Sequence, residues 1–414
     1  MKTLAGWLDF IERQHPKTIA LGLDRVAAVL ARLGVVLRCP VITVAGTNGK
    51  GSTCALLEAM LRAGGYRTGL YTSPHLVRYN ERVRIAGIEA SDESLAASFE
   101  AVEAARKGVE LTYFEYGTLG ALWLFARERL DVAVLEVGLG GRLDAVNAID
   151  ADCAVLTSVG IDHVDYLGPD RESIGREKAG IFRAGRPAVI AEPQPPQSVL
   201  AAPGEKLLLG KDFGYADGKT QWSYWGRGGK RGGLAHPALR GTMQLRNAAA
   251  AMCALDCLKE SLPLGMQEIR RGLAEVALPA RFQVLPGRPQ VILDVAHNAQ
   301  AAEVLAENLA LSGFAPETIG VCGMLRDKDI AGVIGALASR VTRWHMASLT
   351  GPRAASAAEL ARHVAGAECF ATPSLAFEAA LSRASENDKI VVFGSFLTVG
   401  EVLGWLKNNK TSKR

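Results

Sequence analysis

Apolar positions in the first part of the chain follow two periods, one typical of strands and the other of helices. A β-branched run over residues 41–45 enters a loop with three glycines, and an amphipathic run over residues 55–61 follows the loop. Further apolar runs predict strands at 67–72, 131–137 and 153–159. A spacing of three to four residues predicts helices at 92–106, 112–129 and 171–182. This alternation indicates a mainly parallel sheet.

The pattern changes over residues 187–237, where glycine, proline, tryptophan and short β-runs dominate. We interpret this segment as a small antiparallel accessory portion. Helices are expected at 246–259 and 266–275. Residues 279–289 contain Pro-Gly-Arg-Pro, which is typical of a linker between domains.

Beyond this segment, strands and helices alternate regularly. The predicted strands are 291–295, 319–322, 343–347, 368–371 and 389–393, and the predicted helices are 299–311, 330–339, 356–365, 375–384 and 399–407. The expected fold class is therefore α/β in two parts. An N-terminal P-loop-type domain with a mainly parallel sheet and a small β-rich accessory portion covers residues 1–284. A C-terminal Rossmann-like α/β domain covers residues 285–414.

Composition narrows the class of protein. The 414 residues suggest more than one core, and 49% hydrophobic with 22% charged residues is ordinary for a globular enzyme. A net charge of +4 gives no strong case for nucleic acid. Seven scattered cysteines without a Cys-x-x-Cys pair indicate reduced thiols and a cytoplasmic location. No uncharged apolar run is long enough to span a bilayer, so no membrane partner is expected.

The glycine loop that follows the first strand has the parts of a phosphate cradle. Glycines at 46, 49 and 51 let backbone amides face a phosphate, the following helix adds partial positive charge, and Lys50 adds a full charge. Ser52 or Thr53 can supply a hydroxyl to Mg²⁺. The spacing departs from the general P-loop pattern. The alternative is a glycine-rich connection with a surface lysine.

Polar residues stand at the ends of four predicted N-terminal strands. They are Lys50 with Ser52, Ser73, Glu136, and Asp162 with His163. Ligands in an open α/β sheet lie beyond the carboxyl ends of the strands, and oxygen and imidazole groups near an ATP phosphate suit Mg²⁺ or Mn²⁺. Glu136 could instead be a surface acid, and His163 a satisfied core histidine.

Two strands of the second domain also end in polar residues. Asp294, His297 and Asn298 follow the first of them, and Ser395 follows the last. Such residues can hold a ribose, a base or a polar substrate. The alternative, equally compatible with the pattern, is that Asn298 and the Ser395 turn cap the helices that follow.

These motifs together resemble the bifunctional dihydrofolate synthase/folylpolyglutamate synthase family of the Mur ligase superfamily. The stretches that carry the resemblance are GTNGKGS (46–52), SPHLVRY (73–79), LTYFEY (111–116), LEVGLGGRLDA (135–145), DH (162–163), SIGREKAGI (173–181), DVAHN (294–298) and GSF (394–396). They follow the family's order along nearly the whole chain. Jointly they are highly specific, and no single one is.

The resemblance implies a role for each matching residue. ATP would contact Thr47, Asn48, Gly49, Lys50, Gly51, Ser52, Asn247, Arg281 and Asp294. One or two Mg²⁺ ions would be held by Ser73, Glu136 and His163. The pterin substrate would lie against Ile19, Ala20, Leu21, Gly22, Thr112, Tyr113, Phe114, Glu115, Leu143, Asp144 and Ala145. Ala20 departs from the family's pattern, which has Asp there.

Three further residues complete the implied site. Lys178 matches a lysine that is carbamylated in this family and, with Lys50 and His297, forms the implied catalytic set. His297 and Ser395 match positions near the incoming glutamate. Residues 1–284 would then be the ATP- and pterin-binding domain, and residues 285–414 the glutamate ligase domain.

The resemblance implies an ATP-dependent ligase that acts as a monomer on small molecules. Phosphorylation turns the carboxylate of dihydropteroate or of a reduced folate into an acyl phosphate, which the amine of L-glutamate attacks. Closure of the two domains would assemble the site and exclude water. Three alternatives stay open: a monofunctional folylpolyglutamate synthase, a Mur ligase for cell-wall nucleotide precursors, and a nucleotide-dependent switch without ligation.

Overall fold

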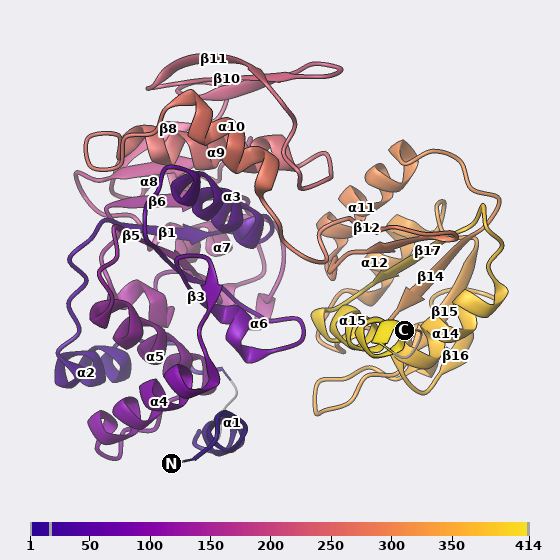
Figure 1. The fold of residues 1–414 in the computed structure, drawn as a ribbon. Coiled ribbons are helices and arrows are strands. Elements are labelled where there is room, and N and C mark those ends of the chain that lie inside the picture. The colour runs from indigo at the N-terminus through magenta and orange to yellow at the C-terminus, as the bar shows by residue number, and fades with distance from the viewer. Residues whose placement is uncertain (1, 16–18, 412–414) are drawn as a thin grey trace. The chain divides into compact units, whose positions relative to one another are not determined.

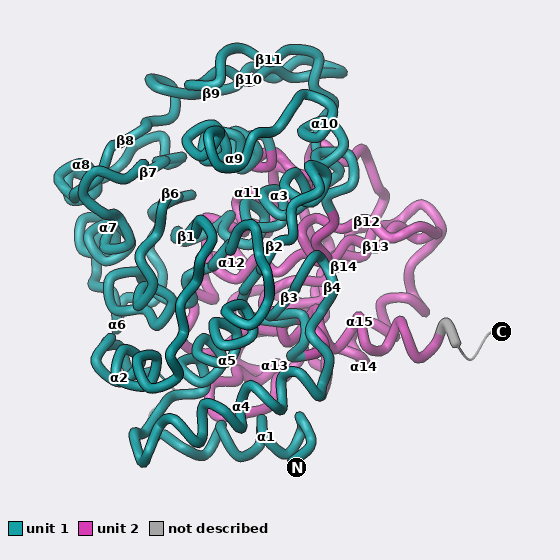
Figure 2. Tube along the Cα trace, turned by 60° about the vertical axis from the view of Figure 1, so that its left-hand side comes forward, with its two compact units in different colours: residues 1–75, 79–238, 245–276 teal, residues 76–78, 239–244, 277–414 magenta. Residues whose placement is uncertain are grey.

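The computed structural model describes residues 2–15 and 19–411, and it divides into two compact units. Figure 2 colours the first unit (residues 1–75, 79–238 and 245–276) and the second (residues 76–78, 239–244 and 277–414). The main change of unit lies between residues 276 and 277, whereas the predicted boundary at 284/285 falls inside a strand of the second unit. The sequence predicts a loop at residues 17–22, and residues 17 and 18 of it lie outside the described residues.

An eight-stranded sheet forms the centre of the first unit. Its order is β4-β3-β2-β5-β1-β6-β7-β8, with parallel pairing from β2 to β8 and an antiparallel hairpin, β3 and β4, at one edge. The strands are β1 Val41–Ala45, β2 Thr68–Tyr71, β3 Val83–Ile85, β4 Ile88–Glu89, β5 Val132–Glu136, β6 Cys153–Leu156, β7 Pro187–Ile190 and β8 Glu205–Leu208. Every residue of β1 is buried, as is typical of a central strand in a parallel sheet that helices cover on both faces. This burial explains its unbroken apolar run.

Helices surround this sheet (Figure 1). They are α1 Leu4–Glu12, α2 Asp24–Leu33, α3 Lys50–Ala63, α4 Asp92–Arg106, α5 Tyr113–Arg127, α6 Val164–Leu167, α7 Arg171–Ala179, α8 Gln197–Ala201, α9 Gln244–Cys257 and α10 Met266–Glu275, with 3-10 turns η1 Tyr79–Arg82 and η2 Ala145–Ala148. The α4 helix has its predicted bounds because Ser91 caps it: the Ser91 hydroxyl accepts from the Ser94 amide at 3.2 Å. Among the helices described, none combines the length and apolar character that a bilayer span requires.

The accessory portion is smaller than predicted. The structure places β7 and β8 in the main parallel sheet, so only β9 Gly214–Asp217, β10 Trp222–Gly226 and β11 Gly229–Leu234 form the antiparallel sheet. The expectation failed over residues 187–208 because two short strands on either side of a proline-rich connection give no local sign of whether they pair parallel or antiparallel. The tyrosine of β10, Tyr224, is buried and donates to Asp256 of α9 at 2.6 Å, which ties the small sheet to the first unit.

The second unit repeats strand and helix as predicted. Its six-stranded sheet has the order β12-β13-β17-β14-β15-β16, and all neighbours except β12 and β13 are parallel. The strands are β12 Gln283–Leu285, β13 Gln290–Leu293, β14 Thr318–Cys322, β15 Arg343–Ala347, β16 Glu368–Phe370 and β17 Lys389–Phe393. The helices are α11 Ala299–Leu311, α12 Ile330–Leu337, α13 Ala357–Ala361, α14 Pro373–Arg383 and α15 Phe396–Thr411.

The predicted linker at 279–289 is wrong in part. Residues 283–285 pair antiparallel with β13, and Gln283 lies opposite Leu293. Prolines and a glycine flank this three-residue edge strand. Because such residues are typical of loops, the sequence did not indicate a strand here.

Candidate active site

The order of the main sheet brings the predicted N-terminal site residues to one edge. Strands β2, β5, β1 and β6 are consecutive neighbours and all run parallel. Ser73 follows β2, Glu136 ends β5, the glycine loop follows β1, and His163 follows β6. Carboxyl ends of parallel strands meet at the same edge, which is where α/β proteins bind ligands. Topology therefore groups these segments as the sequence predicted.

Two glycines of the loop are required by close packing. Gly46 has φ 152°, and a Cβ there would lie 1.9 Å from the hydroxyl oxygen of Thr157. Gly49 has φ 89°, and a Cβ there would lie 2.7 Å from Oδ1 of Asn247, at the start of α9. Any side chain would force the loop away from these neighbours. The predicted ATP contact Asn247 thus lies directly against the loop.

The segment after β6 holds the glycine loop in place. The Thr47 amide donates to the carbonyl of Ser158 at 2.9 Å, and the Thr47 hydroxyl bonds with the carbonyl and the amide of Gly160 at 3.1 and 2.9 Å. The Asn48 amide donates to the Ser158 hydroxyl at 2.9 Å, while Thr157 donates to the Asn48 carbonyl at 2.7 Å. The loop is therefore fixed by protein contacts alone.

Sequence reasoning overlooked Thr157 and Ser158. The sequence feature that could have indicated them is a pair of hydroxyl residues directly after a buried strand. This strand ends at the same edge of the sheet as the glycine loop. Short hydroxyl side chains are common at such positions because they can bond to a neighbouring backbone.

Lys50 is the first residue of α3 and turns back over the loop. Its Nζ donates to the carbonyl oxygens of Gly46 at 2.9 Å and of Thr47 at 3.2 Å. The ammonium group therefore lies beside the loop that would cradle a phosphate, rather than on an open surface. Lys50 is half-buried and bonded to the loop, so it is not an exposed surface lysine.

The predicted metal residues are only partly brought into contact. Ser73 donates its amide to Oε2 of Glu136 at 3.1 Å, and Glu136 is only 4% exposed, so it is no surface acid. His163 directly precedes α6 with φ 53°, and its amide donates to Asp162 at 2.8 Å. Within residues 2–15 and 19–411, no three or more His, Cys, Asp or Glu side chains gather as a metal group. A carboxylate and a hydroxyl beside a phosphate loop nevertheless fit Mg²⁺, which keeps several waters and phosphate oxygens.

Lys178 on α7 is the second lysine of the site and is only 4% exposed. Burial, followed by the charge of Lys50, lowers the pKa of Lys178 from 10.5 to about 7, and Asp162 and Asp144 oppose this shift. Burial raises the pKa of Asp144 to about 6, although its carboxylate accepts from the amides of Leu139 and Val146. The loop thus lies near a buried amine that is partly neutral at pH 7.

Three of the predicted pterin stretches meet in the first unit. The Gly22 amide donates to the carbonyl of Leu143 at 3.2 Å, which joins the first stretch to the third. Arg25 joins the first to the second, because its guanidinium donates to the Ala20 carbonyl at 2.7 Å and to Glu115 at 2.8 Å. Nothing in the sequence indicates this role of Arg25, because its partner Glu115 lies ninety residues further along the chain.

Thr112 and Glu115 have a structural role. They form a capping box at the start of α5: the Thr112 hydroxyl accepts from the Glu115 amide at 3.2 Å, and the Glu115 carboxylate accepts from the Thr112 amide at 2.7 Å. Both residues are buried. The spacing Thr-x-x-Glu is the sequence signature of this cap, and it could have been recognised. Tyr113 and Phe114, which lie between them, are half-buried.

In the second unit, the predicted residues gather at the ends of β13 and β17. These strands are parallel neighbours, and the Gly394 amide donates to the Ala296 carbonyl at 2.9 Å. Asp294 accepts from the amides of Phe282 and Ala296, both at 2.8 Å. Burial raises the pKa of Asp294, and Arg281 opposes this shift. Nδ1 of His297 bonds to the Val295 carbonyl at 2.8 Å.

The helix-cap alternative holds for two of these positions. Asn298 accepts from the Ala301 amide at 2.9 Å at the start of α11. Ser395 is buried, accepts from the Thr398 amide at 3.0 Å and lies 2.8 Å from the Thr398 hydroxyl. The Ser395 hydroxyl is therefore engaged within the turn.

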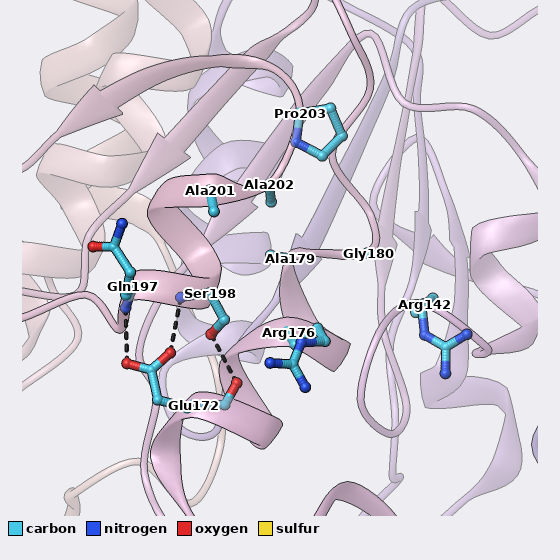
Figure 3. A pocket seen from close by; sticks show the side chains of 10 residues that line it. All are labelled: Arg142, Glu172, Arg176, Ala179, Gly180, Gln197, Ser198, Ala201, Ala202 and Pro203. Atoms are coloured by element: carbon cyan, nitrogen blue, oxygen red, sulfur yellow. Dashed lines mark hydrogen bonds between the residues drawn. The ribbon is translucent and has the colours of Figure 1, made fainter.

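A cavity of about 510 Å³ lies elsewhere in the first unit (Figure 3). Its lining residues are Arg142, Glu172, Arg176, Ala179, Gly180, Gln197, Ser198, Ala201, Ala202 and Pro203. Glu172 accepts from the amides of Gln197 and Ser198 at 2.8 Å each, so its carboxylate serves to anchor α8. None of the predicted site residues lines this cavity.

Comparison with known proteins places both units in one family. The Mur ligase middle domain matches residues 44–255, and the Mur ligase glutamate ligase domain matches residues 280–396. A dihydrofolate synthase/folylpolyglutamate synthase of Escherichia coli is 48% identical over 405 residues, which cover 97% of this chain and 94% of that protein.

Two solved structures are similar along the whole chain. The E. coli FolC in complex with DHPP and ADP has a TM-score of 0.95 and 46% identity, and the match covers 99% of each chain. A bifunctional folylpolyglutamate synthase/dihydrofolate synthase with Mn, AMPPNP and L-glutamate bound has a TM-score of 0.92 and 45% identity, with 98% of each chain covered. The chain therefore belongs to the dihydrofolate synthase/folylpolyglutamate synthase family of ATP-dependent, amide-forming Mur ligases.

Proposed function

We propose that this protein adds L-glutamate both to 7,8-dihydropteroate and to reduced folates, through an acyl phosphate. The observation that carries the proposal is the glycine loop fixed by the segment after β6, with Lys50 folded over it and Glu136 on the neighbouring strand. The relatives named as dihydrofolate synthase/folylpolyglutamate synthase, and those solved with ADP or with L-glutamate, support it.

The loop from Thr47 to Ser52 would bind the ATP phosphates. Its glycines let the backbone approach the phosphates, and the N-terminus of α3 supplies amide donors. Lys50 would exchange its bonds to the loop carbonyls for bonds to phosphate oxygens, and so stabilise charge on the transferred phosphoryl group. Asn247, which lies against Gly49, would contact the same nucleotide.

Ser73, Glu136 and His163 are the residues that would hold Mg²⁺. When bound, the ion would neutralise charge on the phosphate oxygens. The chain's own contribution is the buried carboxylate of Glu136, whose orientation the Ser73 amide fixes at 3.1 Å. The number of ions, one or two, stays a prediction.

Lys178 is proposed to carry a carbamate. Its neutral amine attacks carbon dioxide, a C–N bond forms, and one proton is released to solvent. The pKa of about 7 supports this step, because a lysine at its usual pKa would be almost wholly protonated at neutral pH. The product is an anion, which suits a position near Lys50 better than an ammonium does.

The acceptor would lie against the converging stretches around Leu21, Phe114 and Asp144. In the second unit, Arg281 and Asp294 are proposed as nucleotide contacts, and Nε2 of His297 as the group that approaches the incoming glutamate. Ser395 would contribute through its turn, since its hydroxyl is engaged there. A monomeric, cytoplasmic protein stays our prediction.

The deciding experiment is a substrate panel on the purified chain. Phosphate release from ATP is measured with dihydropteroate or tetrahydrofolate, each with and without L-glutamate. We expect phosphate release from ATP only when the acceptor and glutamate are both present. Mass spectrometry should then detect a glutamylated product. Activity on tetrahydrofolate alone would indicate the monofunctional synthase. Acceptor-independent release would indicate a nucleotide switch.

A further inference from the structure

Glu192 is a buried acid close to the glycine loop that none of the roles above uses. It lies two residues after β7, next to β6 at the same edge of the sheet, and is 7% exposed. Its Oε2 accepts from the amide of Val159 at 2.9 Å. Its Oε1 accepts from the amide of Gln194 at 3.1 Å and from Nη2 of Arg171 at 3.0 Å. Both carboxylate oxygens are therefore engaged.

Val159 connects Glu192 with the glycine loop. It follows Thr157 and Ser158 and precedes Gly160, the residues that bond to the glycine loop. Arg171 also donates its Nε to the Val159 carbonyl at 3.0 Å. The ion pair of Glu192 and Arg171 thus holds both the amide and the carbonyl of one residue, midway between two residues that fix the loop.

A second arginine, Arg246, is influenced by the negative charge of Glu192. Arg246 lies in the first turn of α9, next to Asn247, and its Nε is buried without a hydrogen-bond partner among the described residues. Burial lowers the pKa of Arg246, and the negative charge of Glu192 opposes this shift. Removing the carboxylate would take this compensating charge away from a half-buried guanidinium whose Nε is buried, which is costly.

We propose that Glu192 is a positioning residue for nucleotide binding. It fixes Val159, which lies between the two residues that bond to the glycine loop, so the loop keeps its binding geometry. Groups that orient metal ligands affect metal affinity or activity by about 10–100-fold, and we expect an effect of that size here. The inference rests on the proposed function, because it assumes that this loop binds ATP.

The test compares three variants of the full chain. Glu192→Ala removes every bond of the carboxylate, and Glu192→Gln keeps an oxygen acceptor for Val159 but loses the charge. Asp256→Asn is the matched control: Asp256 is also buried and accepts from an arginine, Arg231, and from the Gly228 amide, at 2.6 and 3.1 Å. It lies near the far end of α9.

The measurements are the Kd of ADP by calorimetry, the KM values of ATP and of glutamate, the melting temperature, and hydrogen exchange of residues 157–163. For Glu192→Ala we expect the ADP Kd and the ATP KM to rise about 10–100-fold. The KM of glutamate should stay within about twofold of wild type, and the Val159 amide should exchange faster. Glu192→Gln should show the same pattern to a smaller degree. Asp256→Asn should lower the melting temperature without weakening ADP binding.

An ADP Kd within about twofold of wild type in Glu192→Ala would overturn the inference, as would an equal loss in Asp256→Asn. If the alanine variant does not fold, Glu192→Gln decides: unchanged ADP affinity and unchanged exchange at Val159 would overturn the inference. The ADP affinity and the exchange rates need no acceptor. A wild-type chain that binds ADP but ligates nothing would therefore refute the proposed function and still test this inference.

Discussion

Thr47 and Gly160 bind each other in both directions. The Thr47 hydroxyl donates to the carbonyl of Gly160 at 3.1 Å and accepts from its amide at 2.9 Å. The two residues follow β1 and β6, which are parallel neighbours. Because the chain itself fixes the loop, nucleotide binding need not pay for ordering it.

The first prediction concerns Lys50. Lys50→Ala removes the ammonium that would face the phosphates, so kcat/KM for ATP should fall on the order of 10²–10³-fold, with a melting temperature close to that of wild type. Lys206→Ala is the control, since Nζ of Lys206 also donates to a backbone carbonyl, that of Gly204, at 3.3 Å. Near-normal turnover of Lys50→Ala at saturating ATP would show that the loop assignment is wrong.

The second prediction concerns Lys178 and carbon dioxide. In CO₂-free buffer, burial lowers the pKa of the Lys178 amine to about 7 in the native chain, whereas its ordinary value is 10.5. Between these pH values the unfolded chain binds a proton that the native chain does not, so the free energy of unfolding should rise with pH. Adding bicarbonate should raise the ligase activity and the free energy of unfolding. The slope should persist, because a carbamate binds no proton whereas the unfolded lysine still binds one. Denaturant titrations from about pH 7 to pH 9 measure both effects on stability.

Lys178→Met is the matched variant, because it keeps the length of the side chain without the amine. It should show neither the pH slope nor the response to bicarbonate. Lys178→Ala should lose activity and regain part of it with a small carboxylate such as acetate. Full activity of Lys178→Met in bicarbonate would refute the carbamate.

The third prediction separates the two acceptors. Phe114→Ala or Leu21→Ala should lower kcat/KM for dihydropteroate on the order of 10-fold more than for tetrahydrofolate, because an apolar contact of this size is worth that much. Lys50→Ala should lower both equally, since the chain offers one phosphate loop. Phe314→Ala is the control, because Phe314 is 92% exposed. Unequal losses at Lys50 would argue against a shared centre.

The fourth prediction distinguishes a cap from a substrate contact. Asn298→Ala should lower the free energy of unfolding by about 1 kcal/mol, because the Ala301 amide at the start of α11 loses its acceptor. The KM of glutamate should not change. His297→Ala should instead raise the KM of glutamate with little effect on stability. Thermal melts and initial rates of both variants decide, and a raised KM in Asn298→Ala would favour substrate contact.

Local features of the sequence predicted the glycine loop, because strand, glycines, lysine and helix are consecutive there. They could not predict what holds the loop: Ser158 lies 110 residues from Asn48 in sequence. The same limit applies to β7, because nothing local shows that Ala188 pairs with Ala154 in the main sheet. Thr112 and Glu115 are a different case, since their spacing already carried the cap signature.

The central position of β1 also affects how the protein is made. Its partners β5 and β6 come about 90 and 110 residues later, with Val44 opposite Glu136 and Val155. On the ribosome, the glycine loop therefore emerges long before residues 157–160, which bond to it. Until then, both edges of β1 remain unpaired. ATP cannot assist the folding of this part until Gly160 has been synthesised. Early nascent chains should accordingly depend on chaperones, not on nucleotide, to remain free of aggregation.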